Sequence, residues 1–235
     1  MENPILLVHG LGTSADRTWG DNGWIDLLRD SGRTVVAPDL LGHGRSPRPH
    51  DPAAYDQLEA EIARHLDEAV GADTVVDAIG FSLGARTVLH LACARPERFG
   101  RLVLAGVGAN LFRRDGTGGP GLADVMLSAS SPESPALAYF HRLAHTDGND
   151  PEALAALLTR PGGPRLSDEA LATITCPVLV VLGEHDFVGP ADPLVDRLTG
   201  AEVALKILPR TDHAATPKNF TFIDAALAFL GAGPP

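Results

Sequence analysis

A serine, an aspartate and a histidine lie far apart in this sequence, each after an apolar run that is typical of a buried strand. Ser82 lies between Gly80 and Gly84, while Asp186 and His213 follow two later runs. A serine hydroxyl is a weak nucleophile at neutral pH, so it needs a histidine to accept its proton and a carboxylate to orient that histidine. These residue types, in this order, predict nucleophilic catalysis by an activated serine.

The residues around Ser82 indicate a sharp turn from a strand into a helix. Thr74–Ile79 is an apolar run, and Leu83–Arg95 has apolar residues at helical spacing. Gly80 and Gly84 lack the side-chain carbon that would collide with neighbouring backbone in such a bend. A surface serine in an ordinary glycine turn is the alternative, but it would not require a strand before it and a helix after it. The turn is therefore predicted to expose the serine hydroxyl above the sheet.

His213 is the histidine whose position fits the proton acceptor, because it lies between the last predicted strand and the last predicted helix. That loop is expected to open at the same edge of the sheet as Ser82. Asp186 is the predicted orienting acid, and its neighbour Glu184 is the competitor, expected at the surface. Asp212 adjoins His213 but is poorly placed, because neighbouring side chains in an extended loop diverge.

Two backbone amides are candidates for binding the negative charge that develops on a substrate oxygen. The helix after Ser82 would direct the amide of Leu83 at the site. The segment Val8–Gly12 follows the first predicted strand, and its glycines allow close approach of the backbone. We expect the amide of Leu11 to be the second donor of this oxyanion hole.

The elements that must position these residues alternate along the chain. Short β-branched or leucine-rich runs alternate with amphipathic segments, which is typical of a parallel sheet covered by helices. The predicted strands are Ile5–Val8, Thr34–Ala37, Thr74–Ile79, Leu102–Ala105, Val178–Leu182 and Val203–Leu208. The predicted helices beside them are Trp24–Asp30, Tyr55–Val70, Leu83–Arg95, Pro190–Leu198 and Pro217–Leu230.

One region, residues 110–175, shows no strand pattern. Its predicted helices are Leu122–Ser128, Pro135–His145, Glu152–Thr159 and Asp168–Ile174. Residues 1–109 and 176–235 are therefore predicted to form an α/β core, and residues 110–175 a helical cap. Because the region separates two strands, we interpret it as a lid over the carboxyl end of the sheet. The alternative is a helical layer on the side of the sheet.

The length, hydrophobic content and net charge of the chain limit the classes of function that it can have. With 235 residues, 44% of them hydrophobic, the chain can form a single α/β domain. A net charge of −11 without a lysine–arginine cluster argues against a nucleic-acid partner. No apolar run has the length of a membrane span and no signal-peptide pattern is present, so we expect a cytoplasmic protein without a membrane partner. No histidine–carboxylate spacing predicts a metal site. The oligomeric state stays open.

Taken together, these motifs resemble the α/β-hydrolase superfamily. The matching stretches, in the order that family shows, are His9–Gly12, Asp39–Ser46, Gly80–Gly84, Gly183–Asp186 and Asp212–His213. The resemblance implies a cofactor-free hydrolase with the triad Ser82, Asp186 and His213. It also implies that residues 110–175 shape the acyl and alcohol pockets, and that Asp39–Ser46 is a structural turn.

The chain departs from the family at its amino end. The family usually has two further strands before the His-Gly loop, whereas eight residues precede His9 here. We therefore expect a trimmed, mostly parallel sheet of about six strands, with Thr34–Ala37 at its edge.

Arg86 lies one turn along the helix that follows Ser82. The stretch Gly80–Arg86 is similar to the corresponding turn of the menaquinone-pathway lyase that eliminates pyruvate, which implies an arginine that holds a substrate carboxylate. The alternative is an ion pair that supports the helix. The expected reaction is hydrolysis of a carboxylic ester, lactone or related small acyl substrate. Carbon–carbon cleavage, elimination or perhydrolysis with the same triad, and small-molecule binding without turnover, stay open.

Overall fold

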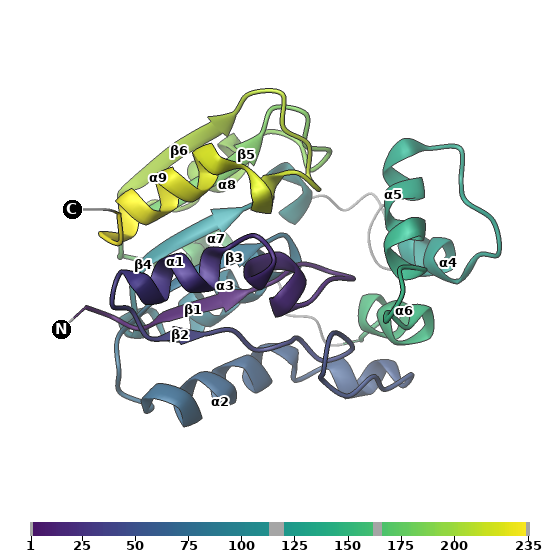
Figure 1. The fold of residues 1–235 in the computed structure, drawn as a ribbon, viewed down its shortest axis with the longest axis horizontal. Helices are drawn as coiled ribbons and strands as arrows, with labels where there is room; N and C mark the ends of the chain where they lie inside the picture. Colours follow the sequence, from purple (N-terminus) through teal and green to yellow (C-terminus); the bar gives the residue numbers. More distant parts are fainter. Residues whose placement is uncertain (1, 113–119, 162–165, 234–235) are drawn as a thin grey trace.

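The computed structural model describes residues 2–112, 120–161 and 166–233. Six strands form one sheet in the order β2-β1-β3-β4-β5-β6, and every neighbouring pair is parallel (Figure 1). The strands are β1 (Ile5–Val8), β2 (Val35–Val36), β3 (Val76–Phe81), β4 (Phe99–Ala105), β5 (Val178–Gly183) and β6 (Val203–Leu208). The predicted six-stranded parallel sheet, with the segment around residue 35 at its edge, is confirmed.

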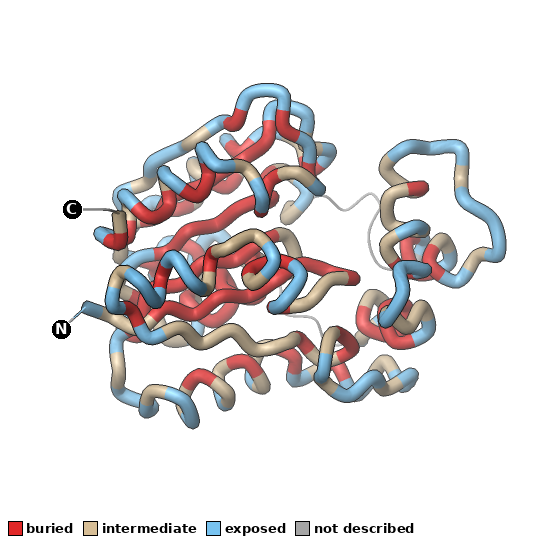
Figure 2. Tube along the Cα trace, in the orientation of Figure 1, coloured by how far each residue is buried: buried red, intermediate tan, exposed pale blue. Residues whose placement is uncertain are grey.

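Helices cover both faces of this sheet. They are α1 (Trp24–Asp30), α2 (Leu58–Val70), α3 (Leu83–Ala94), α4 (Pro120–Leu127), α5 (Pro135–Ala144), α6 (Pro151–Leu158), α7 (Asp168–Leu171), α8 (Asp192–Val195) and α9 (Phe220–Leu230). The strands β1, β3 and β5 are buried along their whole length, and the outward sides of the helices are exposed (Figure 2). Strands with helices on both faces must be apolar on both faces, which explains their continuous apolar runs.

The core therefore has two layers, one on each side of the sheet. In β1, Leu6 packs into a layer with α2 and α3, whereas Leu7 packs into a layer with α1 and α9. On the second side Trp24 and Phe222 have ring centroids 4.7 Å apart. The alternation follows from the two-residue period of side chains along a strand.

Several predicted helices are shorter than their patterns, including α2, α7, α8 and α9. The range Pro190–Leu198 contains only α8, because Pro193 has no backbone N–H to donate and is tolerated only in the first turn of a helix. The range Tyr55–Val70 begins instead with a separate 3₁₀ turn at Pro52–Tyr55, and α2 follows it from Leu58. The side chain of Asp51 caps that turn by accepting a hydrogen bond from the amide of Ala53, 3.0 Å away.

Three helices of the predicted cap gather beyond the carboxyl ends of the strands (Figure 1). Of these, α4 contacts both α5 and α6. The fourth helix, α7, contacts α3 of the core instead. Within the range 110–175, residues 113–119 and 162–165 lie outside the described part of the chain. Among the described helices, none has the length and apolar character needed to cross a bilayer.

Candidate active site

The turn at Ser82 has the geometry that its glycines predict. β3 ends at Phe81 and α3 begins at Leu83, and Ser82 between them has φ 55° and ψ −115°. A Cβ at Gly80 would lie 2.5 Å from the Cα of Ala85, and one at Gly84 would overlap the carbonyl of Val8. A side chain at Gly80 would force β3 and α3 apart, and one at Gly84 would force α3 away from the end of β1. The two glycines thus permit a turn that holds the serine side chain at the carboxyl edge of the sheet.

Positive φ at a residue with a side chain is strained, typically by about 1–3 kcal/mol. We therefore expect the free energy of unfolding of Ser82→Gly to be about 1 kcal/mol higher than that of Ser82→Ala, because glycine adopts this conformation without steric cost. Both variants remove the hydroxyl, so their difference reports the relief of backbone strain less the extra conformational entropy that glycine loses on folding, about 0.5–1 kcal/mol. Urea denaturation followed by circular dichroism measures it. A lower midpoint for Ser82→Gly than for Ser82→Ala would show that the turn is not strained.

His213 lies between Ser82 and Asp186 and forms hydrogen bonds with both. Its Nδ1 is 2.9 and 3.0 Å from the two carboxylate oxygens of Asp186, and its Nε2 is 2.9 Å from the Oγ of Ser82. The side chain of Asp186 is fully buried and that of His213 is 4% exposed. An Nδ1–H that donates to the carboxylate leaves Nε2 as an acceptor for the serine hydroxyl. This arrangement can withdraw the serine proton.

Two adjacent loops hold the acid and the histidine. The amide of His185 donates to the carbonyl of Thr211 at 3.0 Å. A Cβ at Gly183 would overlap the backbone of Thr211. The loop after β5 therefore runs directly against the loop after β6. Within its own loop, Asp186 accepts a hydrogen bond through Oδ1 from the amide of Val188 at 3.1 Å. This bond fixes the rotation of the carboxylate.

The two competing acids lie elsewhere. Glu184 is exposed, and its Oε2 accepts a hydrogen bond from the amide of Arg210 at 2.7 Å. Asp212 is also exposed, and its Oδ1 accepts from the amide of Ala215 at 2.8 Å. Each of these carboxylates thus stabilises a turn. The ring of His213 forms its carboxylate hydrogen bonds with Asp186 instead.

The loop that follows β1 lies against the serine. A Cβ at Gly10 would be 3.4 Å from the Cβ of Ser82. Buried His9 receives a hydrogen bond at Nε2 from the amide of Leu40, at 3.0 Å, so its Nδ1 carries the proton and donates to the carbonyl of Gly10 at 2.8 Å. Burial lowers the pKa of His9, which favours this neutral ring. In the described part of the chain no backbone hydrogen bond uses the amide of Leu11.

The amide of Leu83 is the other predicted donor. As the first residue of α3, Leu83 has no carbonyl one turn earlier in its helix to receive its N–H. The positive end of the helix dipole lies at the same place. Both predicted amides, Leu11 and Leu83, are thus on segments that adjoin Ser82.

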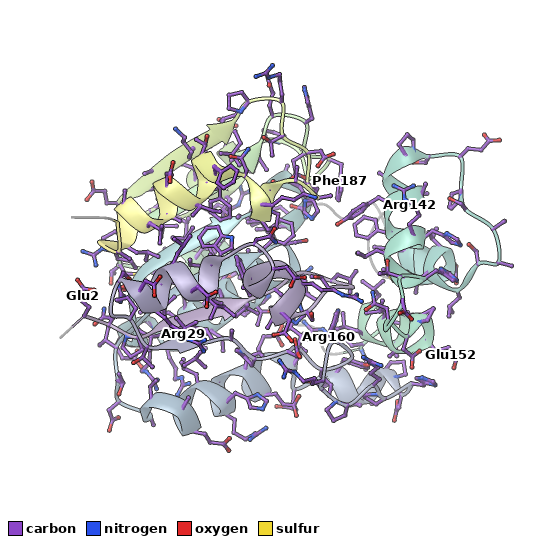
Figure 3. All side chains as sticks on the ribbon, viewed as in Figure 1. Glu2, Arg29, Arg142, Glu152, Arg160 and Phe187 are labelled. Carbon is purple, nitrogen blue, oxygen red and sulfur yellow. The ribbon has the colours of Figure 1, made fainter. Side chains whose placement is uncertain are left out.

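Aromatic side chains surround the ring of His213, a feature absent from the sequence analysis. The ring centroids of Phe187 and Phe81 lie 4.5 and 4.9 Å from that of His213, and that of Tyr139 on α5 lies 6.1 Å away. Phe187 also contacts Phe140 at 5.4 Å, and Figure 3 shows it between the strand ends and α5. Burial, with the charges of nearby acids, raises the pKa of Tyr139 to about 12. The helical insertion therefore contributes an apolar wall to the site.

Arg86 points into a charged, buried region beside α3. Its Nε is buried without a hydrogen-bond partner, and burial lowers its pKa. The nearby pair of Arg160 and Glu59 is joined by contacts of 2.7 and 3.1 Å, with both side chains nearly buried. One turn further along α3, burial lowers the pKa of His90 to about 4. Two guanidinium groups thus share one carboxylate here, which leaves an excess of positive charge.

No group of histidine, cysteine and acidic side chains that could hold a metal ion occurs in residues 2–112, 120–161 and 166–233.

Known proteins with similar sequences and folds include hydrolases of several kinds. A family model described as alpha/beta hydrolase fold matches residues 3–127. The chain is 27% identical over 212 residues to the 2-hydroxymuconate semialdehyde hydrolase of Pseudomonas sp. strain CF600, which covers 88% of this chain and 66% of that protein. It is 29% identical to the pimeloyl-[acyl-carrier protein] methyl ester esterase of Neisseria meningitidis, and that match covers 89% of this chain and 85% of the esterase.

The fold is also found among solved structures. The 2-hydroxy-6-oxo-6-phenylhexa-2,4-dienoate hydrolase of Rhodococcus sp. strain RHA1 matches with a TM-score of 0.71 and 23% identity, over 99% of this chain and 91% of that one.

The sequence matches to other curated relatives are partial. They span only 36–41% of the length of those proteins.

Proposed function

The chain belongs to the α/β-hydrolase fold family, and on that premise we propose that it is a cofactor-free serine hydrolase of small acyl compounds such as carboxylic esters and lactones. The observation that carries this proposal is the continuous hydrogen-bonded series from Ser82 through His213 to Asp186. A binding protein without turnover would gain nothing from a strained serine aligned with a buried histidine and carboxylate.

The reaction proceeds in two halves. In the first, His213 accepts the proton of Ser82 while the serine oxygen attacks the substrate carbonyl carbon. The amides of Leu11 and Leu83 bind the oxyanion, and Asp186 stabilises the imidazolium that forms. His213 then protonates the leaving group, which departs and leaves an ester with the serine. In the second half, water deprotonated by His213 attacks that ester and releases the acid.

Within residues 110–175, the helices α4, α5 and α6 act as the cap of this site. Two observations support this role: α5 places Tyr139 and Phe140 beside Phe187, and Tyr139 also lies beside His213. These rings exclude water from one side of the histidine. They also favour a flat or apolar group on the substrate, since aromatic rings bury large areas at low conformational cost.

A panel of p-nitrophenyl esters of increasing acyl length, run beside aliphatic and aromatic lactones, tests the proposal. We expect hydrolysis of at least one class, with an initial burst of p-nitrophenol where deacylation is slower than acylation. A fluorophosphonate should form a covalent bond with Ser82, detectable as a mass increase on its peptide. If the chain neither hydrolyses any of these compounds nor reacts with the fluorophosphonate, the proposal is wrong.

A second candidate reaction is carbon–carbon bond cleavage by the same triad. The favouring observation is the buried guanidinium of Arg86, one helical turn from Ser82, whose Nε lacks a partner. Such a group would hold a carboxylate on the substrate, and the semialdehyde hydrolase to which the chain is similar has a name that fits a carbon–carbon bond cleavage.

The variant Arg86→Gln tests whether Arg86 holds a carboxylate on the substrate. We expect KM to rise by about 10- to 100-fold for ester or diketone substrates that carry a carboxylate, because one charge-assisted hydrogen bond contributes about 1.5–3 kcal/mol. Neutral esters of the same size should be unaffected. Arg64→Gln, on the exposed side of α2, serves as the control of equal charge change. A uniform loss on all substrates would instead show that Arg86 supports the helix.

A further inference from the structure

The loop that carries the amide of Leu11 has little intrinsic rigidity. Gly10 and Gly12 flank Leu11, and Gly12 adopts a φ of 67°. Glycine loses more conformational freedom on folding than any other residue, so this loop needs hydrogen bonds to hold its peptide planes. On the amino side, His9 provides one: its Nδ1–H donates to the carbonyl of Gly10, which belongs to the same peptide group as the Leu11 amide.

On the carboxyl side, the corresponding bond comes from a residue distant in sequence. Nδ2 of Asn149 donates to the carbonyl of Gly12 at 2.6 Å and to the carbonyl of Leu143 at 2.8 Å. Because both partners are acceptors, the end of the amide that faces them must be the nitrogen. The side chain of Leu143 also covers the loop, since a Cβ at Gly12 would lie 2.5 Å from its Cγ.

Asn149 lies in the turn between α5 and α6, and that turn is held at several points. Its own amide donates to the carbonyl of Thr146 at 3.0 Å. A guanidinium nitrogen of Arg17 donates to the carbonyl of Asp147. The next residue, Asp150, caps α6 and contacts His50 at 2.9 Å. The turn thus joins the helical insertion to the core beside the loop of Leu11.

We infer that Asn149 is a positioning residue that completes the oxyanion hole, because it holds the Gly12–Thr13 peptide plane on the carboxyl side of the loop while His9 holds the plane that contains the Leu11 amide. This inference rests on the proposed function. The hydrogen bond from Asn149 to the carbonyl of Gly12 then couples the turn between α5 and α6 to the alignment of the Leu11 amide. The site reaches its full activity only with this hydrogen bond in place, and the helical insertion contributes to transition-state binding as well as to the substrate pocket.

The sizes of the effects are bounded. Complete loss of one oxyanion donor costs about 100- to 1,000-fold in kcat, whereas one neutral hydrogen bond contributes about 1 kcal/mol. Removal of Asn149 misaligns the Leu11 amide without eliminating it. The expected loss in kcat is therefore on the order of 10-fold.

The test compares Asn149→Ala, Asn149→Asp and the control Arg17→Ala. Arg17→Ala removes a hydrogen bond to the same turn but does not touch the loop of Leu11. Asn149→Asp preserves the shape of the side chain but places an oxygen opposite two carbonyls, so a role in filling space alone would leave it active. For each variant, kcat and KM are measured on an ester that the wild type hydrolyses. Affinities are measured for a boronic acid, which forms a tetrahedral adduct with Ser82, and for the product carboxylic acid.

For both Asn149 variants we expect kcat and boronate affinity to fall together by about 10-fold, with KM and product affinity within about twofold of wild type. Arg17→Ala should match the wild type in all four values. The inference fails if the Asn149 variants behave like Arg17→Ala, or if they lose product affinity as much as boronate affinity while keeping the wild-type circular dichroism spectrum. A wild-type chain that neither turns over esters nor binds the boronate refutes the proposed function itself.

Discussion

Ser82→Ala is expected to lower the hydrolysis of esters by at least about 10,000-fold, because without the hydroxyl no acyl-enzyme forms. The Oγ of Ser82 is the atom at 2.9 Å from Nε2 of His213, so its loss removes the nucleophile and leaves the histidine and aspartate in place. Alanine retains the Cβ and therefore the backbone strain of the turn. The unfolding free energy should change by less than about 1 kcal/mol, since the lost hydrogen bond is the only favourable contact removed.

Initial rates on the best ester of the panel, with thermal denaturation of the same preparation, measure both effects. Ser130→Ala, on the exposed segment after α4, is the matched control and should retain wild-type rates. If Ser82→Ala hydrolyses the ester at the wild-type rate, another residue is the nucleophile.

Asp186→Asn is expected to reduce kcat by about 10,000-fold through a change of histidine tautomer. In the wild-type protein one carboxylate oxygen accepts the Val188 amide, and both oxygens lie within 3.0 Å of Nδ1 of His213. An asparagine would place its oxygen on the Val188 amide and its NH₂ against Nδ1. Nδ1 would then become the acceptor and Nε2 would carry the proton, so the ring could no longer accept the proton of Ser82.

Glu184→Gln is the control for this variant, because it makes the same chemical change two residues away. Its side chain accepts the amide of Arg210 and lies outside the triad. We expect rates within about twofold of wild type, as is usual for an exposed substitution away from the reacting groups. Steady-state kinetics across pH 6–9 compares the two variants. A larger loss from Glu184→Gln than from Asp186→Asn would identify Glu184 as the acid.

The elements that were predicted best are those whose determinants are local. β1 and β6 have the predicted bounds, and so does α1, because the limits of a short apolar run or an amphipathic turn can be read from its own residues. The turn at Ser82 was predictable for a related reason. Gly80 is demanded by an atom only five residues away, the Cα of Ala85, whereas Gly84 is demanded by the distant carbonyl of Val8.

The convergence of the loops after β3, β5 and β6 was also accessible, because strand-end loops of a parallel sheet meet at one edge. Glu184 and Asp186 share one of these loops, so the choice between them required the folded chain, in which Asp186 bonds the ring of His213 and Glu184 accepts the amide of Arg210. The hydrogen-bond distances within the triad also required the folded chain.

The tertiary structure decided everything that depends on contacts between distant segments. Asn149 bonds a carbonyl 137 positions away, and Arg160 pairs with Glu59 across 101 positions. The aromatic wall around His213 likewise joins α5 to the end of β3 and to the loops after β5 and β6. No periodicity or spacing encodes such pairs, because each is set by how separately folded elements pack. The sequence by itself therefore determined the sheet, the serine turn and the order of the triad, and only three-dimensional packing determined what surrounds them and holds them in position.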